Sequence, residues 1–216
     1  KVLEKREVSS ERPLVIITAE NAINPATKLQ KEIHASLGKH IPFYVTESAI
    51  FCSTIEAENS SIDIQSEDFD VLPFDPSRVP FSFPELPFLQ PEENFPLLLT
   101  RKIYTYNCAS AAIAYLGALK GYHLYGEAAN DEDIARLLEL LYADVNSVLC
   151  KQYDIALADQ EDFALRSKVK FQNKEILDSV ERNARDASRK LASDERLIGP
   201  LVLAVKHRLL SHASAV

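Results

Sequence analysis

Hydrophobic positions follow two different periods along the chain, and the change of period falls near its middle. Residues 14–18 form a short apolar run rich in β-branched side chains, which predicts a buried strand of a parallel sheet. Residues 24–38 open with Asn-Pro, continue with leucine or isoleucine at four-residue steps and end on glycine, which predicts a capped helix. Residues 43–54 and 62–72 are candidate strands. This order of elements predicts part of an α/β unit.

Prolines concentrate between residues 73 and 96, where the chain carries seven of its eleven. Proline is disfavoured in helix interiors and central strands, so this segment predicts an irregular connector. We place a domain boundary within this segment. Residues 1–92 are expected to form the α/β part with the connector, and residues 93–216 a helical domain.

The second half shows helical periodicity throughout. Residues 97–120 predict one long helix closed by Gly121, and Asn130 predicts the cap of the next helix. The core face of that next helix is expected to be Ile134, Leu137, Leu138, Leu141, Val145, Val148 and Leu149. Three further helices are expected over residues 162–171, 176–192 and 195–211. The expected fold class is α+β, mainly α.

Composition and charge exclude several classes of function. The net charge of −8 repels phosphate backbones and anionic lipid, so neither nucleic acid nor a membrane surface is an expected partner. The three cysteines form no CxxC pair and the five histidines show no metal-binding spacing, so we expect neither disulfides nor a metal. No apolar run reaches transmembrane length and no signal-peptide pattern is present, which favours a cytoplasmic protein.

Two polar stretches of the predicted elements carry candidate chemistry. Asn21 follows the strand 14–18, where α/β sheets gather ligands, and its amide either donates to a substrate or merely satisfies the turn. Lys102, Asn107 and Ser110 interrupt an apolar helix. At about 100° per residue, Asn107 lies about 140° and Ser110 about 80° around from Lys102, an arc that a lysine side chain can bridge. A buried lysine is costly unless it is paired or neutral, and the alternative is a lysine that reaches solvent.

A third stretch is a basic cluster in this acidic chain, formed by Arg182, Arg185, Arg189 and Lys190. Guanidinium groups bind phosphate and carboxylate in bidentate fashion, so the cluster is a candidate anion site. The alternative is a solvated helix face with intrahelical pairs such as Glu181 with Arg185.

The three stretches together resemble one family, the polyol-specific long-chain dehydrogenases, from about residue 13 to residue 207. The turn at Glu20 and Asn21 resembles the turn that supplies a catalytic asparagine in that family. Lys102 and Asn107, five residues apart, match its catalytic lysine and second asparagine. The flanking sequences agree as well: Ala114-Tyr-Leu-Gly117 and Asp194-Glu-Arg-Leu-Ile-Gly-Pro-Leu201.

The resemblance also covers the basic cluster. Arg182 and Lys190, eight residues apart, match the family's substrate-binding arginine and lysine, and Arg185 and Arg189 are further candidates for a phosphate. The resemblance assigns Glu20 to the cofactor side of the site. It also implies a helical domain like the C-terminal domain of 6-phosphogluconate dehydrogenase.

The implied reaction is hydride transfer between a polyol carbon and NAD or NADP, without a metal. Lys102 would be the general base, and burial together with the positive charges of Arg182 and Lys190 would lower its pKa toward neutral pH. Asn21 and Asn107 would donate hydrogen bonds to the developing alkoxide. The expected partner is thus a small-molecule polyol or polyol phosphate.

Two departures from the family pattern affect this interpretation. Ser110 stands where the family usually has histidine, and serine does not titrate near neutral pH. The five glycines form no GxGxxG, so residues 1–92 are interpreted as the later part of a Rossmann-type domain without its glycine-rich unit. The cofactor is then expected to be bound mainly by a portion outside this chain. With no methionine present, even at residue 1, we interpret the chain as a fragment.

The substrate is left open among related polyols. The Glu-Asn-Ala-Ile turn and the Arg-Leu-Ile-Gly-Pro-Leu ending resemble the hexitol-phosphate branch, which implies mannitol 1-phosphate and fructose 6-phosphate. Free hexitols and hexuronates are alternatives. Two further hypotheses are a catalytically silent sugar-phosphate-binding relative and a plain helical interaction module.

Overall fold

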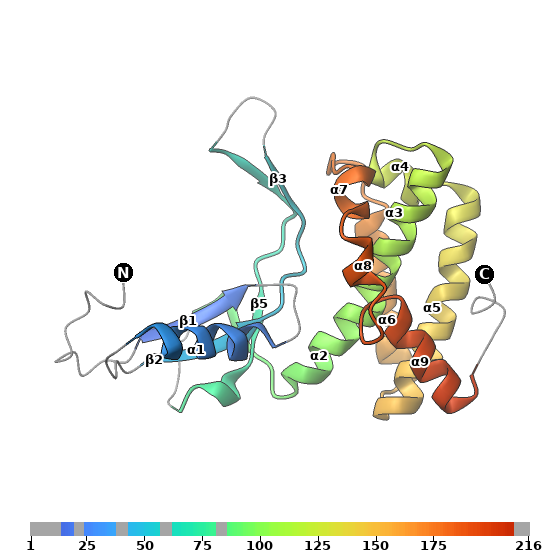
Figure 1. Cartoon of the computed structure of the whole chain (residues 1–216). Coiled ribbons are helices and arrows are strands. Elements are labelled where there is room, and N and C mark those ends of the chain that lie inside the picture. Colours follow the sequence, from blue (N-terminus) through green and yellow to red (C-terminus); the bar gives the residue numbers. More distant parts are fainter. Residues whose placement is uncertain (1–13, 20–23, 38–42, 57–61, 81–85, 210–216) are drawn as a thin grey trace. The chain divides into compact units, whose positions relative to one another are not determined.

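The computed structural model describes residues 14–19, 24–37, 43–56, 62–80 and 86–209 (Figure 1). By their contacts these residues fall into two compact units. The first lies within residues 1–52 and 68–98, and the second within residues 53–67 and 99–216.

The first unit is built on a four-stranded sheet with the order β1-β2-β5-β6. Its elements are β1 Leu14–Ala19, α1 Pro25–Ser36, β2 Phe43–Ser48, β5 Leu72–Phe74, the short 3-10 helix η2 Pro76–Arg78 and β6 Leu89–Pro91. Strands β1 and β2 run parallel, and α1 connects them as a crossover helix. Ala26 and Ile33 of α1 pack on Phe43 and Val45 of β2. The predicted strand and helix at the start of the chain are thus confirmed.

The start of α1 differs from the prediction in one detail. Asn24 has a left-handed backbone with φ of 53°, and its side chain makes no capping hydrogen bond. Pro25 occupies the first turn as expected. The expected end at Gly38 lies outside the described residues, and α1 ends at Ser36.

The lengths of the two strands predicted over residues 43–54 and 62–72 are wrong. Strand β2 ends at Ser48, and two short strands, β3 Thr54–Glu56 and β4 Ile64–Ser66, pair antiparallel as a separate hairpin.

The prediction that proline keeps residues 73–96 free of strands is also wrong. Strand β5 contains Pro73 and lies inside the sheet, between β2 and β6. The proline carbonyl accepts from the N–H of Ala49 at 3.0 Å, while the N–H groups of Leu72 and Asp75 donate to Phe88 and Glu47. Because the neighbouring residues supply the donors, a three-residue strand does not need the N–H that proline lacks.

The second unit is mainly helical and carries the β3–β4 hairpin. Its elements are α2 Phe95–Lys102, the π-helical turn η3 Ile103–Asn107, α3 Cys108–Lys120, α4 Tyr125–Ala129, α5 Glu132–Tyr153, α6 Leu157–Phe171, α7 Val180–Ala184, α8 Ala187–Lys190 and α9 Ile198–His207. The first residues of α2 belong to the first unit. The expected class, α+β with a mainly helical second part, is confirmed. None of the described helices is long and apolar enough to cross a membrane.

The core of the helical unit forms where α3, α4, α5 and α6 meet. The predicted face of α5 is buried or half-buried, and the same face includes Tyr142 and Asn146, which the apolar pattern missed. The cap of α5 is Asp131 and not Asn130, because the Asp131 carboxylate accepts from the N–H groups of Asp133 and Ile134. Asn130 instead donates to the carbonyls of Gly126 and Gln172.

Two predicted helices are interrupted. The helix expected over residues 97–120 contains the π-helical turn η3, although Gly121 closes it with φ of 79° as expected. The helix expected over residues 176–192 is broken into α7 and α8, because Arg185 is extended and Asp186 is left-handed with φ of 63°. The remaining helices differ at their ends: α6 begins earlier than residue 162, and α9 covers less than residues 195–211.

Candidate functional site

Lys102 is the last residue of α2 and is only 3% exposed. The alternative of a lysine that reaches solvent is therefore wrong. A cation at this depth costs free energy unless its surroundings compensate for the lost hydration. Lys102 is thus an ionisable side chain held inside the fold.

The π-helical turn η3 directly follows Lys102 and ends at Asn107. The N–H of Cys108 donates to the carbonyl of Ile103, five residues earlier, instead of to the fourth residue as in an α-helix. The separation of about 140° between Lys102 and Asn107, which assumed regular α-helix, therefore does not apply here. The wider turn brings residues five apart closer to one face of the helix.

A buried polar network contacts this turn. Gln160 of α6 has no exposed surface, and its amide nitrogen donates to Thr105 Oγ1 at 3.0 Å and to Asn146 Oδ1 at 3.1 Å. Its oxygen accepts from Nε of Arg101 at 2.9 Å. These four residues come from α2, η3, α5 and α6, and the apolar pattern of the sequence pointed to none of them. The only signal was a polar residue, Asn146, at a position on the core face of α5.

Tyr104 of the same turn packs closely on the start of α9. A side chain at Gly199 would place its Cβ 2.6 Å from Cζ of Tyr104. The Tyr104 hydroxyl donates to the carbonyl of Asp194 at 3.3 Å. Gly199 is therefore required by this close approach, which gives a physical role to the Ile-Gly-Pro segment.

The predicted basic cluster does not form one solvated helix face. Arg182 is half exposed, pairs with Asp178 at 2.9 Å and donates to the carbonyl of Thr54 at 3.4 Å. Asp178 also accepts from the side-chain amide of Asn183 at 2.8 Å, and the carbonyl of Asn183 accepts from Nζ of Lys190. The structure thus links Arg182 and Lys190 through Asp178 and Asn183.

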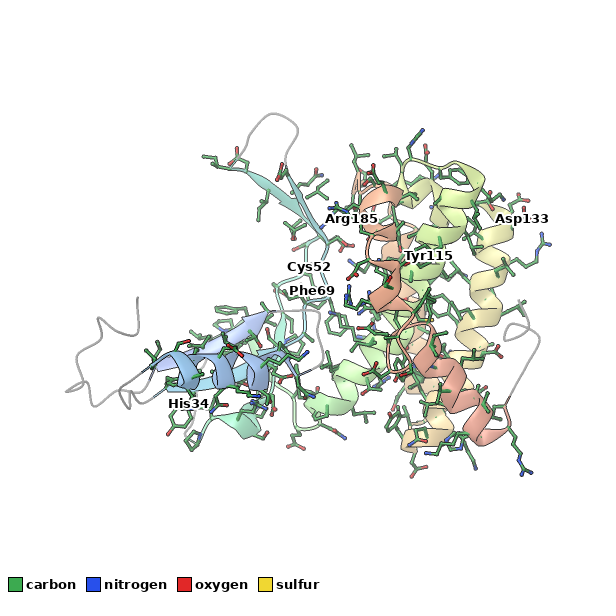
Figure 2. All side chains as sticks on the ribbon, in the orientation of Figure 1. His34, Cys52, Phe69, Tyr115, Asp133 and Arg185 are labelled. Atoms are coloured by element: carbon green, nitrogen blue, oxygen red, sulfur yellow. The ribbon has the colours of Figure 1, made fainter. Side chains whose placement is uncertain are left out.

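Lys190 is buried, with the arginines Arg196 and Arg189 and the carboxylates Asp186 and Glu195 in its surroundings. Burial lowers the pKa of Lys190 below its usual value, and the charges of Arg196 and Arg189 lower it further. Its Nζ lies 5.8 Å from the ring centre of Tyr115 on α3, a residue that is labelled in Figure 2. The hydroxyl of Tyr115 is buried and has no hydrogen-bond partner within the described part of the chain.

The other two cations of the cluster lie apart from this pair. Arg189 forms ion pairs with Asp186 and with Glu195. Arg185, labelled in Figure 2, is exposed at the connection between α7 and α8. It lines a surface hollow together with His123 and Ser179. The structure therefore engages Arg189 with carboxylates and leaves Arg185 at the surface.

Glu20 and Asn21 lie outside the described residues. The strand that precedes them is nonetheless fixed at its carboxyl end, where Thr18 Oγ1 donates to the Thr46 carbonyl at 3.1 Å. Ser48 Oγ donates in turn to the Thr18 carbonyl at 2.8 Å. In this way β1 and β2 are joined near the carboxyl end of β1, which directly precedes Glu20 in the sequence.

Ser110 lies half-buried on α3, and its carbonyl accepts from the Tyr125 hydroxyl at 3.4 Å. In the part of the chain that the structure describes, no three His, Cys, Asp or Glu side chains gather as metal ligands would. The structure thus places Lys102 directly before the π turn that ends at Asn107, and it links Arg182 with Lys190 through Asp178 and Asn183.

Comparison with known proteins identifies relatives of this chain. Residues 97–214, more than half of the chain, match the model of the mannitol dehydrogenase C-terminal domain family. The mannitol-1-phosphate 5-dehydrogenase of Clostridium acetobutylicum is 30% identical over 209 residues, which are 93% of this chain and 54% of that protein. The enzyme of the same name from Buchnera aphidicola (Schizaphis graminum) is 38% identical over 117 residues, 54% of this chain and 30% of that protein.

A solved structure supports the fold assignment. The Pseudomonas fluorescens mannitol 2-dehydrogenase, in a ternary complex with NAD and D-mannitol, superimposes with a TM-score of 0.66 and 17% identity, covering 93% of this chain and 45% of that one. The chain spans about half the length of the curated relatives it matches, or less. With the family match over the whole helical region, this chain belongs to the mannitol dehydrogenase family and carries its C-terminal domain.

Proposed function

We propose that this chain is the substrate-binding and catalytic part of a polyol dehydrogenase that acts on a hexitol phosphate with NAD or NADP. The observation that carries the proposal is the buried Lys102, placed directly before a π turn that ends in Asn107, in a member of the mannitol dehydrogenase family. Two relatives named mannitol-1-phosphate 5-dehydrogenase favour mannitol 1-phosphate and fructose 6-phosphate as the pair.

The proposed chemistry divides between the nicotinamide and the side chains of this chain. When bound, the nicotinamide accepts or supplies the hydride. Lys102 Nζ takes the hydroxyl proton of the substrate as the hydride leaves, which requires a neutral amine. Asn107, and Asn21 from the Glu-Asn turn, donate hydrogen bonds to the oxygen while its negative charge grows.

The basic pair would hold the rest of the substrate. Arg182 presents a planar fork of donors that suits a phosphate, and Lys190 supplies a second positive charge linked to it through Asn183. Arg189 is engaged by carboxylates, so we assign it a supporting part, and exposed Arg185 remains an additional candidate for the phosphate. Glu20 is proposed to face the cofactor.

The test is oxidation of mannitol 1-phosphate, followed at the nicotinamide absorbance, by the protein as its gene encodes it. Lys102→Ala should lower kcat by about 100- to 10,000-fold, because it removes the general base. The matched control is Lys174→Ala, which removes an exposed lysine and should leave kcat unchanged. Equal turnover by Lys102→Ala and the wild type would contradict the proposal, and faster turnover of free mannitol would contradict the phosphorylated substrate.

One observation favours a second function, a sugar-phosphate-binding relative without catalysis. By the family resemblance, Ser110 stands where a histidine is usual, and a serine hydroxyl does not titrate near neutral pH. Calorimetric binding of mannitol 1-phosphate, without turnover in either the wild type or Ser110→His, would support this second function. Turnover by the wild type would exclude it.

A further inference from the structure

The π turn between Lys102 and Asn107 requires a physical explanation. Such a turn gives up the regular hydrogen-bonding register of the α-helices on both sides, and it persists where the surrounding structure holds it. The residues that hold it are therefore expected to touch the turn through buried, directional contacts.

Gln160 makes contacts of this kind. A primary amide offers two donor hydrogens and an acceptor oxygen, and those of Gln160 are directed at Thr105, Asn146 and Arg101. Since Gln160 has no exposed surface, no water replaces a lost partner, and each buried group left unpaired costs about 1–3 kcal/mol. The amide and its partners thus fix one another.

The positions of these partners matter for the site. Arg101 precedes Lys102, and Thr105 lies in the middle of the turn. Gln160 therefore forms hydrogen bonds with residues on both sides of Lys102. Its amide nitrogen also donates to Asn146 of the long helix α5. Helices α5 and α6 thereby act as a frame for the segment that carries the lysine.

We propose that Gln160 is a positioning residue, which holds the π turn and so sets the direction of Lys102 relative to Asn107. The catalytic consequence rests on the function proposed above, whereas the hold on the turn does not. A displacement of about 1 Å in a reacting group can lower the rate as much as about 100-fold.

Two variants remove different numbers of the hydrogen bonds that Gln160 forms. Gln160→Leu keeps the size of the side chain and removes all three hydrogen bonds, and Thr105→Val removes only one. The matched control is Ser167→Ala, because Ser167 is equally buried on α6 and forms a 2.6 Å hydrogen bond with Tyr142 of α5. The control breaks a buried bond between the same two helices without touching the turn.

The first readout is amide hydrogen exchange of peptides within residues 101–110, which needs no turnover. Exchange should accelerate about tenfold in Thr105→Val, as expected for one buried hydrogen bond, and more in Gln160→Leu. It should stay unchanged in Ser167→Ala. Unchanged exchange in both test variants would overturn the proposal. If Gln160→Leu does not fold, Thr105→Val decides.

The second readout is steady-state kinetics. We expect kcat to fall about 10- to 100-fold in Gln160→Leu with little change in KM, because the lost alignment matters mainly in the transition state. An equal fall in Ser167→Ala would overturn the positioning role in favour of general packing. If the wild type turns over no polyol, the proposed function fails, and the exchange experiment still decides whether Gln160 holds the turn.

Discussion

At the scale of single residues, the protein contains two buried lysines that are candidates for function. Lys102 and Lys190 are both removed from water, and burial of a positive charge opposes folding. At Lys190 the consequence is visible as a pKa below the usual value, although its Nζ still donates to the carbonyl of Asn183. Buried ionisable side chains are candidates for function, which agrees with the roles proposed for both lysines.

Gly199 gives a stability prediction at the same scale. Gly199→Ala should lower the free energy of unfolding by about 1–3 kcal/mol, because the added methyl group overlaps the Tyr104 ring. Urea unfolding monitored by circular dichroism measures the loss. Exposed Val202→Ala in the same helix is the control and should change little.

A rescue experiment makes this prediction specific. In a Gly199→Ala/Tyr104→Leu double variant the smaller side chain at position 104 removes the overlap. The double variant should therefore lose less free energy of unfolding than the two single variants lose together. Simple additivity would show that Gly199 matters for another reason.

At the scale of elements, the ends of helices depend on particular carboxylates. Asp131 caps α5 and also accepts from Lys120 at 2.6 Å and from the Tyr122 hydroxyl at 2.8 Å. These hydrogen bonds, with that of Lys120 first, lower the pKa of Asp131 below 3.8, and they raise the pKa of Lys120 to about 12. The start of α5 and the end of α3 are joined by this contact.

The two pKa shifts predict how the contribution of Asp131 depends on pH. A lowered carboxylate pKa stabilises the fold above pH 3.8, and this stabilisation is lost as pH falls through the folded value. The raised pKa of Lys120 stabilises the fold below pH 10.5, and this stabilisation is lost as the pH rises toward about 12. The difference in Tm between the wild type and Asp131→Asn should therefore not change with pH near neutrality. It should become smaller at strongly acidic and at strongly alkaline pH. A difference that is constant down to about pH 2 would contradict the acidic half.

Helix interruptions show the limits of periodicity at this scale. Residues 97–120 and 176–192 both carry helical patterns, yet one contains a π turn and the other breaks at Asp186. A pattern of apolar residues indicates which face of a helix is buried. It does not distinguish a regular turn from one with an additional or a missing residue. The interruptions were therefore invisible in the sequence.

At the scale of the whole molecule, contacts join segments that are distant in sequence. Residues 53–67 group with the helical unit, and Lys170 of α6 pairs with Glu67 and donates to Ser53 Oγ at 2.9 Å. The division at residues 92 and 93 remains our proposal for the two domains of the family, and the hairpin contacts cross that division in sequence.

The Lys170–Glu67 pair predicts how strongly the hairpin is attached. Glu67→Gln should cost about 1–3 kcal/mol, because it leaves the largely buried Lys170 charge without its carboxylate. The double variant Glu67→Gln/Lys170→Met should cost less than the single one. Chemical denaturation of the three variants tests both statements. A double variant that is less stable than Glu67→Gln would show that the ion pair is not what holds the hairpin.

The sequence by itself determined the mainly helical second half, the β1–α1–β2 order, the face of α5 and the stop at Gly121. These features depend on local periodicity and on single-residue backbone preferences, which are present in the sequence. The sequence also indicated Lys102, Asn107, Arg182 and Lys190 as one set, through a family resemblance and not through physics.

Only the tertiary structure decided the burial of Lys102, the π turn beside it and the link from Arg182 to Lys190. The π turn has partners far away in sequence, as Gln160 is from Thr105 and Gly199 is from Tyr104. The link from Arg182 to Lys190 is local, and it needed the break between α7 and α8 that periodicity did not show. Hydrogen bonds and close packing select among backbone conformations that differ by a few kcal/mol, and local patterns do not carry that information.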